Sequence, residues 1–150
     1  MAKDQILEFH KQIVDLVKKY QFRDRNEMSA FGISVSQCYI LETLHTYGDL
    51  TMNELAKKMY LSISTVTRVV EQLVRKRYVR REETPNDRRV RLITLTGAGR
   101  ALYQKAWQKV FVSERTILEN LPAANRKVVI DFLATLNRAV ESWRYSCCKS

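Results

Sequence analysis

Apolar positions recur along this chain with a helical period nearly everywhere, and with a strand period in one short region. The helical period predicts helices over residues 4–20, 36–47, 51–60, 63–77, 98–120 and 123–145. Two β-type runs, 78–83 and 90–95, flank a turn-forming segment and predict a hairpin, beside which Leu50 is expected to pair as a short strand. Residues 21–34 are polar and predict irregular structure. With only 4 Gly and 2 Pro, the chain is expected to be mainly α with a small β-wing.

The segment from Thr51 to Thr96 predicts a winged helix-turn-helix. Thr51 and Glu54 have the spacing of a capping box, in which each side chain satisfies the backbone N–H of the other residue. Ser62 is the expected cap of the next helix. The expected inward positions of the two helices are Leu55, Ala56, Met59, Val66, Val69, Val70 and Leu73, and those of the helix before them are Tyr39, Ile40, Leu44 and Tyr47.

The helix that begins after Ser62 has a polar and basic outer face. Short hydroxyl side chains at its start allow close approach to DNA, where free N–H groups can meet a phosphate. Arg68 is long enough to reach a base edge in the major groove. The alternative is an ordinary solvated helix face. Such a face usually carries several acidic residues, whereas this one carries a single acid, Glu71. The DNA-contacting residues predicted on this helix are Ser62, Ser64, Thr65, Arg68, Gln72 and Arg75.

The hairpin carries two arginines at its tip, Arg88 and Arg89. A guanidinium on a narrow tip can enter the minor groove, whose negative potential attracts it. Asp87 does not favour DNA by its own charge, but it can orient Arg89 through a charge-assisted hydrogen bond. Asp87, Arg88 and Arg89 are therefore predicted to contact DNA beside the helix.

Basic charge is concentrated in this same segment. The net charge is +10, and residues 51–100 hold 12 Lys and Arg against 5 Asp and Glu, a net +7. Such a concentration is the electrostatic footprint of a nucleic-acid binder, whereas a solvated basic surface would spread the excess more evenly. Double-stranded DNA is therefore the expected partner.

Other classes of function find little support. The chain has two His, no carboxylate pair at a recognisable spacing and no glycine-rich phosphate loop, so neither an enzyme nor a metal or cofactor is expected. No signal peptide and no apolar run of about 20 residues are visible, so we expect a cytoplasmic protein without a membrane partner. The three cysteines do not predict a disulfide framework. Cys38 is expected in the core, and Cys147 and Cys148 as exposed thiols.

The helices outside the central segment carry more apolar surface than a small DNA-binding lobe needs for its own core. This surplus predicts a homodimer interface, with an intramolecular three-helix bundle as the alternative. The expected organisation is a single domain over residues 1–150. It consists of a winged-helix lobe at 34–96 and a helical dimerisation lobe at 4–30 and 98–146.

Four stretches of the chain resemble the MarR family of bacterial winged-helix transcription regulators. They are TMNELAKKMYLSISTVTRVVEQLVRK, YVRR, PNDRR and LITLTGAGR, within residues 36–103. The resemblance implies a homodimer built from the N-terminal helix and the two C-terminal helices. It also implies recognition helices in successive major grooves and wing arginines in minor grooves. The family's Asp-x-Arg wing pattern is matched by Asp87 and Arg89.

The resemblance further implies a small aromatic or phenolic effector, bound between the dimer lobe and the DNA lobe. Five residues are candidates to line such a crevice, although core or surface roles explain them equally: Phe9, His10, Ile13, Tyr39 and His45. The expected function is that of a sequence-specific regulator, a repressor released by its effector. The alternative is a nonspecific nucleoid-type DNA binder or a protein-interaction module with the same fold.

Overall fold

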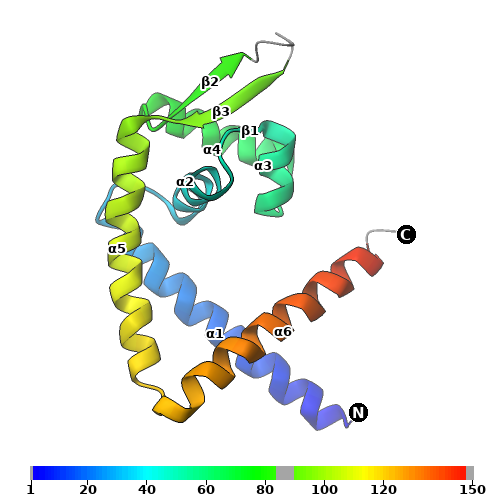
Figure 1. Ribbon diagram of the computed structural model, residues 1–150. Coiled ribbons are helices and arrows are strands. Elements are labelled where there is room, and N and C mark those ends of the chain that lie inside the picture. Colours follow the sequence, from blue (N-terminus) through cyan, green and yellow to red (C-terminus); the bar gives the residue numbers. More distant parts are fainter. Residues whose placement is uncertain (1, 84–89, 148–150) are drawn as a thin grey trace. The chain divides into compact units, whose positions relative to one another are not determined.

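The computed structural model describes residues 2–83 and 90–147, and these contain six helices and a three-stranded sheet (Figure 1). The elements are α1 (Lys3–Ser29), α2 (Val35–Tyr47), β1 (Leu50–Thr51), α3 (Met52–Met59), α4 (Ile63–Arg75), β2 (Val79–Glu83), β3 (Arg91–Leu95), α5 (Gly97–Glu119) and α6 (Ala123–Cys147). The chain forms two compact units, Met1–Val110 and Phe111–Ser150.

The first unit contains a winged helix. Its sheet is antiparallel with the strand order β1-β3-β2, so the two-residue strand β1 pairs with β3, as predicted. Leu50 lies opposite Ile93, and Val79 lies opposite Leu95 on the other side of β3. The pairing ties the start of the helix pair α3–α4 to the strands of the hairpin. The mainly helical fold with a small wing is thereby confirmed.

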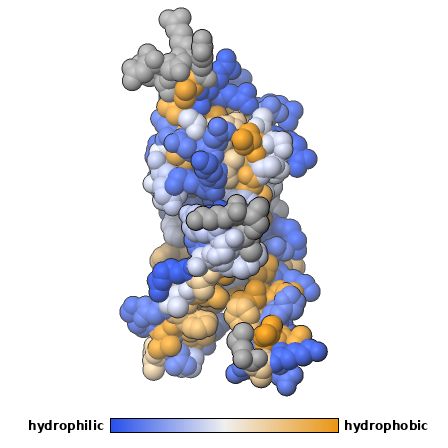
Figure 2. Space-filling view, turned by 90° about the vertical axis from the view of Figure 1, so that its right-hand side faces the viewer, coloured by the Kyte–Doolittle hydropathy of each residue, from blue (hydrophilic) through white to orange (hydrophobic). Residues whose placement is uncertain are grey.

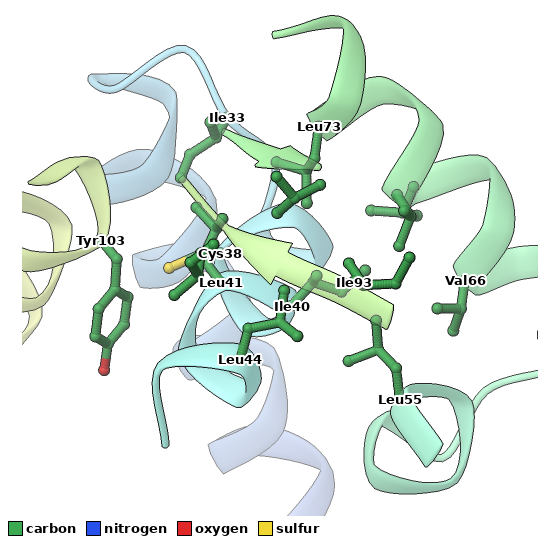
Figure 3. Close-up of a cluster of buried hydrophobic side chains, with 14 of the residues drawn as sticks. Ile33, Cys38, Ile40, Leu41, Leu44, Leu55, Val66, Leu73, Ile93 and Tyr103 are labelled. Carbon is green, nitrogen blue, oxygen red and sulfur yellow. The ribbon is translucent and has the colours of Figure 1, made fainter. Parts of the chain in front are cut away.

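The core of this unit forms where α2, α3 and α4 meet the sheet (Figure 3). Leu55, Val66 and Ile93 converge there from α3, α4 and β3, each at most 1% exposed. Burying one such side chain contributes about 1.5–3 kcal/mol. All the predicted inward positions of α3 and α4 are buried except Met59, which is half-buried against the same core.

The predicted end of the first helix, near residue 20, is wrong, because α1 continues to Ser29. Ala2 is the N-cap of α1. The polar residues after position 20 stay helical because they find partners on α2. Asp24 is buried, and its Oδ2 accepts a hydrogen bond of 2.7 Å from the Tyr39 hydroxyl, while its Oδ1 accepts one of 2.6 Å from Arg23.

The predicted inner face of α2 is half correct. Ile40 and Leu44 are buried, whereas Tyr39 and Tyr47 are 45% and 59% exposed. The face is rotated because α2 buries Gln37, Cys38 and Leu41 instead. Helix α2 ends at Tyr47 and is capped by Gly48, whose φ of 80° favours glycine.

The start of α5 is fixed to the strand region by a close backbone approach. The Thr96 hydroxyl donates to the Arg77 carbonyl (2.8 Å) and accepts from the N–H of Gly99 (3.0 Å). The Thr96 N–H donates to the Tyr78 carbonyl over 3.1 Å. A Cβ on Gly99 would lie 2.0 Å from that carbonyl oxygen, so only glycine fits without a shift of the backbone.

The second unit is a helical hairpin in which Arg126 of α6 closes the turn. Its guanidinium donates to the carbonyl of Glu119 (3.1 Å), the last residue of α5, and to that of Leu121 (3.3 Å) in the turn. No described side chain of α6 is buried.

Large apolar side chains are exposed on three helices, and part of this surface is visible in orange in Figure 2. Among the described residues, no helix combines the length and apolar character that a membrane span requires. The exposed set is Ile6, Leu7, Phe9, Leu16, Val17 and Phe22 on α1, Trp107, Phe111, Val112 and Ile117 on α5, and Val128, Ile130, Phe132, Leu133, Val140, Trp143 and Tyr145 on α6.

Candidate nucleic-acid interface

The predicted caps hold both helices of the helix-turn-helix. The Thr51 hydroxyl accepts from the Glu54 N–H (3.2 Å), and the Glu54 carboxylate accepts from the Thr51 N–H (2.8 Å). The bond from the Thr51 N–H, followed by a 2.8 Å bond that the Thr51 hydroxyl donates to the same carboxylate, lowers the pKa of Glu54. Tyr60 ends α3 in the left-handed conformation, with φ 55°. The turn between the helices is therefore short and defined on both sides.

Three hydroxyl groups gather at the start of α4. Ser62 Oγ accepts from the Thr65 N–H (3.2 Å) and lies 3.0 Å from Ser64 Oγ and 2.8 Å from Thr65 Oγ1. Ser62 and Ser64 are exposed, and Thr65 is half-buried. Because the cap uses the Thr65 N–H, the first N–H groups of α4 are those that can meet an anion.

Arg68 and Arg75 point outward from α4. Both are exposed, and neither has an ion pair or a hydrogen bond with another described residue. Glu71 on the same face lies 3.8 Å from the Arg81 guanidinium of β2, so its charge is partly neutralised. An open cleft of about 250 Å³ lies here, lined by Glu71, Val74, Arg75 and Arg81. The outer face of α4 thus retains a positive balance.

Gln72 is placed differently from the arginines. It is half-buried, and its carbonyl oxygen accepts a 2.8 Å hydrogen bond from the side-chain amide of Gln37 on α2. Gln37 is 4% exposed and also accepts from Lys76, which in turn donates to the Gly32 carbonyl. This network joins the C-terminal end of α4 to the start of α2. Lys76 is also the C-cap, so α4 ends at Arg75, two residues before the predicted end.

Gln37 is the residue of this region that the sequence analysis missed. The signal was present, because Ser34 and Gln37 have capping-box spacing. In the structure, each side chain accepts from the backbone N–H of the other residue, at 3.2 Å. The bond to Gln72 joins residues 35 positions apart, and no local pattern predicts it.

The hairpin contributes further basic side chains below its tip. Arg80 and Arg91 are exposed, and Arg80 is paired with Glu82 at 2.6 Å. The tip residues predicted to contact DNA, Asp87, Arg88 and Arg89, lie outside the described residues.

The five candidate effector residues fall into two groups. Phe9, His10 and Ile13 lie on the first half of α1, and Phe9 is 52% exposed. Tyr39 contacts Asp24, which lies about 16 Å further along α1 than Ile13, at 1.5 Å per residue. Within one chain, α1 therefore keeps its first half away from Tyr39.

In the second group, His45 lies beside α5. The His45 ring packs on that of Tyr103, with centroids 4.7 Å apart at 41°. Tyr103 is buried, and burial, with charges from neighbouring Glu42 and Cys38, raises its pKa to about 12. Tyr39 and His45 are thus exposed members of an aromatic and acidic surface along α2.

Cys38 occupies the core, as predicted. Burial, followed by the charges of Glu42 and Asp24, raises the pKa of its thiol to about 12. A thiol of this kind is a poor nucleophile because the thiolate is the reactive form. The side chains of Cys147 and Cys148 lie outside the described residues.

Comparison with known proteins places these features in a family. Residues 33–90 match the model of the MarR family. The multiple antibiotic resistance protein MarR of Escherichia coli is 30% identical over 66% of this chain and 69% of its own length.

Two solved structures are similar over nearly their whole length. A MarR family protein from Bacillus stearothermophilus is 26% identical with a TM-score of 0.85, covering 94% of this chain and 99% of that one. A cysteine-to-serine variant of E. coli MarR complexed with operator DNA is 25% identical with a TM-score of 0.77, covering 89% and 96%. The chain with this winged helix therefore belongs to the MarR family, whose members are DNA-binding transcription regulators and not enzymes.

Proposed function

We propose that the protein is a homodimeric repressor that reads duplex DNA with two α4 helices in successive major grooves and two wings in the adjacent minor grooves. The observation that carries the proposal is the outer face of α4. It begins with three exposed or half-buried hydroxyls and continues with Arg68 and Arg75, which have no partner among the described residues. Arginines held by acids would lose part of their attraction for phosphate, and these two are not so held.

The proposed dimer follows from the exposed apolar side chains of α1, α5 and α6. Large apolar side chains exposed in this number usually mark an interaction site. A second copy of the chain is the partner we propose, because a twofold dimer would present two identical recognition helices to a palindromic operator. Half-sites are then expected roughly 10 base pairs apart. The solved complex of the MarR variant with operator DNA supports this use of the fold.

We also propose that the dimer represses transcription and that an effector releases it from DNA. A dimer seated on DNA can block a polymerase without further contacts. A small aromatic or phenolic effector would act by binding one spacing of the two winged helices better than another. The surface around Tyr39 and His45 is the proposed contact, since it joins aromatic rings from α2 and α5. Such a site would include Phe9, His10 and Ile13 only if they came from the second chain of the dimer.

Binding-site selection followed by anisotropy titration tests the proposal. Wild-type protein is expected to select a consensus. Arg68→Ala and Arg89→Ala are each expected to cost about 1–3 kcal/mol on that consensus and less on scrambled DNA. Arg115→Ala is the matched control, because it removes the same charge from α5, where Arg115 pairs with Glu119 at 2.7 Å.

Three results would count against the proposal. Wild-type affinity in both arginine variants would contradict the assigned reading residues. An equal loss of DNA affinity in Arg115→Ala would show that the effect comes from net charge alone. A flat selection profile at all salt concentrations would instead support the nonspecific nucleoid-type binder.

A further inference from the structure

Gln72 differs from the other residues on the outer face of α4, because part of its side chain is already engaged inside the protein. We propose that Gln72 is a specificity-determining residue that presents its amino group to DNA, and that buried Gln37 imposes this orientation by holding the Gln72 carbonyl oxygen. The inference rests on the proposed placement of α4 in the major groove.

The orientation of both amides follows from two groups that can only donate. The Ser34 N–H and the Lys76 ammonium both approach the same atom of Gln37, at 3.2 and 3.1 Å. Neither group can accept a hydrogen bond, so this atom is the carbonyl oxygen of Gln37, with both lone pairs used. The amino group of Gln37 must then face Gln72, 2.8 Å away, and the atom that accepts from it is the Gln72 carbonyl oxygen.

The free end of Gln72 is therefore its amino group. No described residue accepts a hydrogen bond from it. On an α-helix, Gln72 lies one turn beyond Arg68 and about 40° around the axis from it. The two N–H groups are thus offered on the flank of the face that carries Arg68.

An amide held in this orientation has different base preferences from a free glutamine. A free glutamine pairs with adenine through both its oxygen and its amino group. To do so here, the Gln72 oxygen, which faces Gln37, would have to turn toward the groove, and the amino group of Gln37, a residue that is 4% exposed, would lose its acceptor. Leaving the Gln37 amino group without an acceptor would lower DNA affinity by roughly 5- to 150-fold, and the pairing with adenine would raise it by a factor in the same range. Pairing with adenine therefore has no net advantage.

Guanine is the base that fits best. Its major-groove edge presents two acceptors, N7 and O6, to which the two N–H groups can donate, whereas adenine presents an amino group beside its N7. The structure thus predicts guanine in preference to adenine at the base pair that Gln72 meets.

Gln72→Glu provides the most discriminating test. One carboxylate oxygen can still accept from Gln37, so the buried bond is kept, while the outward group changes from donor to acceptor. In binding-site selection, the preference at one base-pair position is expected to move from guanine to cytosine, whose amino group donates, by about tenfold. Gln72→Ala is expected to abolish the preference at that position only. Gln108→Glu, which adds the same charge at an exposed position of α5, is expected to leave every preference unchanged.

Amide hydrogen exchange in the free protein tests the network without DNA. The side-chain N–H groups of Gln37 are expected to exchange slowly in wild type and in Gln72→Glu, and faster in Gln72→Ala. Equal exchange in all three, selection of adenine at the Gln72 position, or a consensus that no Gln72 variant alters would each overturn the inference. Slow exchange of the Gln37 side-chain N–H groups, together with no selected consensus, would contradict the proposed function and therefore also the role of Gln72 in reading a base.

Discussion

Gly99 joins α5 to the winged helix, and replacing it with alanine tests that junction. A Cβ at this position would lie 2.0 Å from the Tyr78 carbonyl oxygen and 2.9 Å from its carbon. Both of the atoms that it would meet belong to the backbone, so no side-chain rotation can relieve the contact. Gly99→Ala is therefore expected to destabilise the first compact unit.

The magnitude follows from what must move. Relief requires α5 to separate from Tyr78, whose carbonyl accepts the Thr96 N–H at 3.1 Å. Forcing a methyl group into a packed site costs about 1–3 kcal/mol, and weakening one hydrogen bond costs about 1 kcal/mol. Alanine returns up to about 1 kcal/mol through its better helix propensity. The expected net loss is about 1–3 kcal/mol, or roughly 3–10 °C in Tm.

Gly97→Ala is the matched control, because Gly97 lies in the same first turn of α5 and a Cβ there would meet nothing within 4 Å. It is expected to leave stability unchanged or raise it by up to about 1 kcal/mol. Urea unfolding followed by circular dichroism gives both values. The protein concentration must be the same throughout, since association shifts apparent stability. Equal free energies of unfolding for the two variants would refute the close-approach argument.

Three further predictions concern single groups. The Glu54 carboxyl, whose pKa is lowered by the backbone N–H of Thr51, stabilises α3 above the pKa of the unfolded carboxyl and loses this effect as the pH falls through the lowered value. Thr51→Val keeps this N–H but removes the hydroxyl, which also donates to the Glu54 carboxylate, so an NMR titration is expected to show the pKa rising part of the way toward its ordinary value, and the lost cap costs about 1 kcal/mol. Cys38, whose thiol pKa is raised to about 12 by burial, is expected to react far more slowly with a thiol reagent in the native state than in urea, in a background without the two C-terminal cysteines. Tyr39→Phe removes the donor to buried Asp24 and is expected to cost about 1–2 kcal/mol in urea unfolding, whereas a loss near zero would show that the bond contributes nothing.

Local signals predicted the winged helix well. The caps at Thr51 and Ser62 depend on residues three positions away, so they can be found from spacing alone. The inward positions of α4 follow the helical period because that helix has one buried face and one exposed face. These residues determine where α4 begins and which of its faces is left for DNA.

Errors arose where a distant partner decides the structure. The segment after residue 20 looks like a loop because its residues are polar, yet Asp24 stays in the helix through its bond to Tyr39. The role of Gln37 is similar, because its spacing from Ser34 shows a cap while its bond to Gln72 depends on how α2 packs against α4. Hydrogen bonds between elements leave no period in the sequence, so only the fold reveals them.

Because α6 is exposed, the proposed dimer is expected to contribute to the thermal stability of the protein. Helices in water are only marginally stable without packing, and α6 has 25 residues of which no described side chain is buried. Its Phe132 and Trp143 are 61% and 65% exposed. If a second chain covers this face, Tm should rise with protein concentration, because each tenfold increase favours the dimer by about 1.4 kcal/mol. A Tm that stays constant over a hundredfold range would mean that α6 is covered within one chain, and the two α4 helices would then have no interface to fix their spacing on DNA.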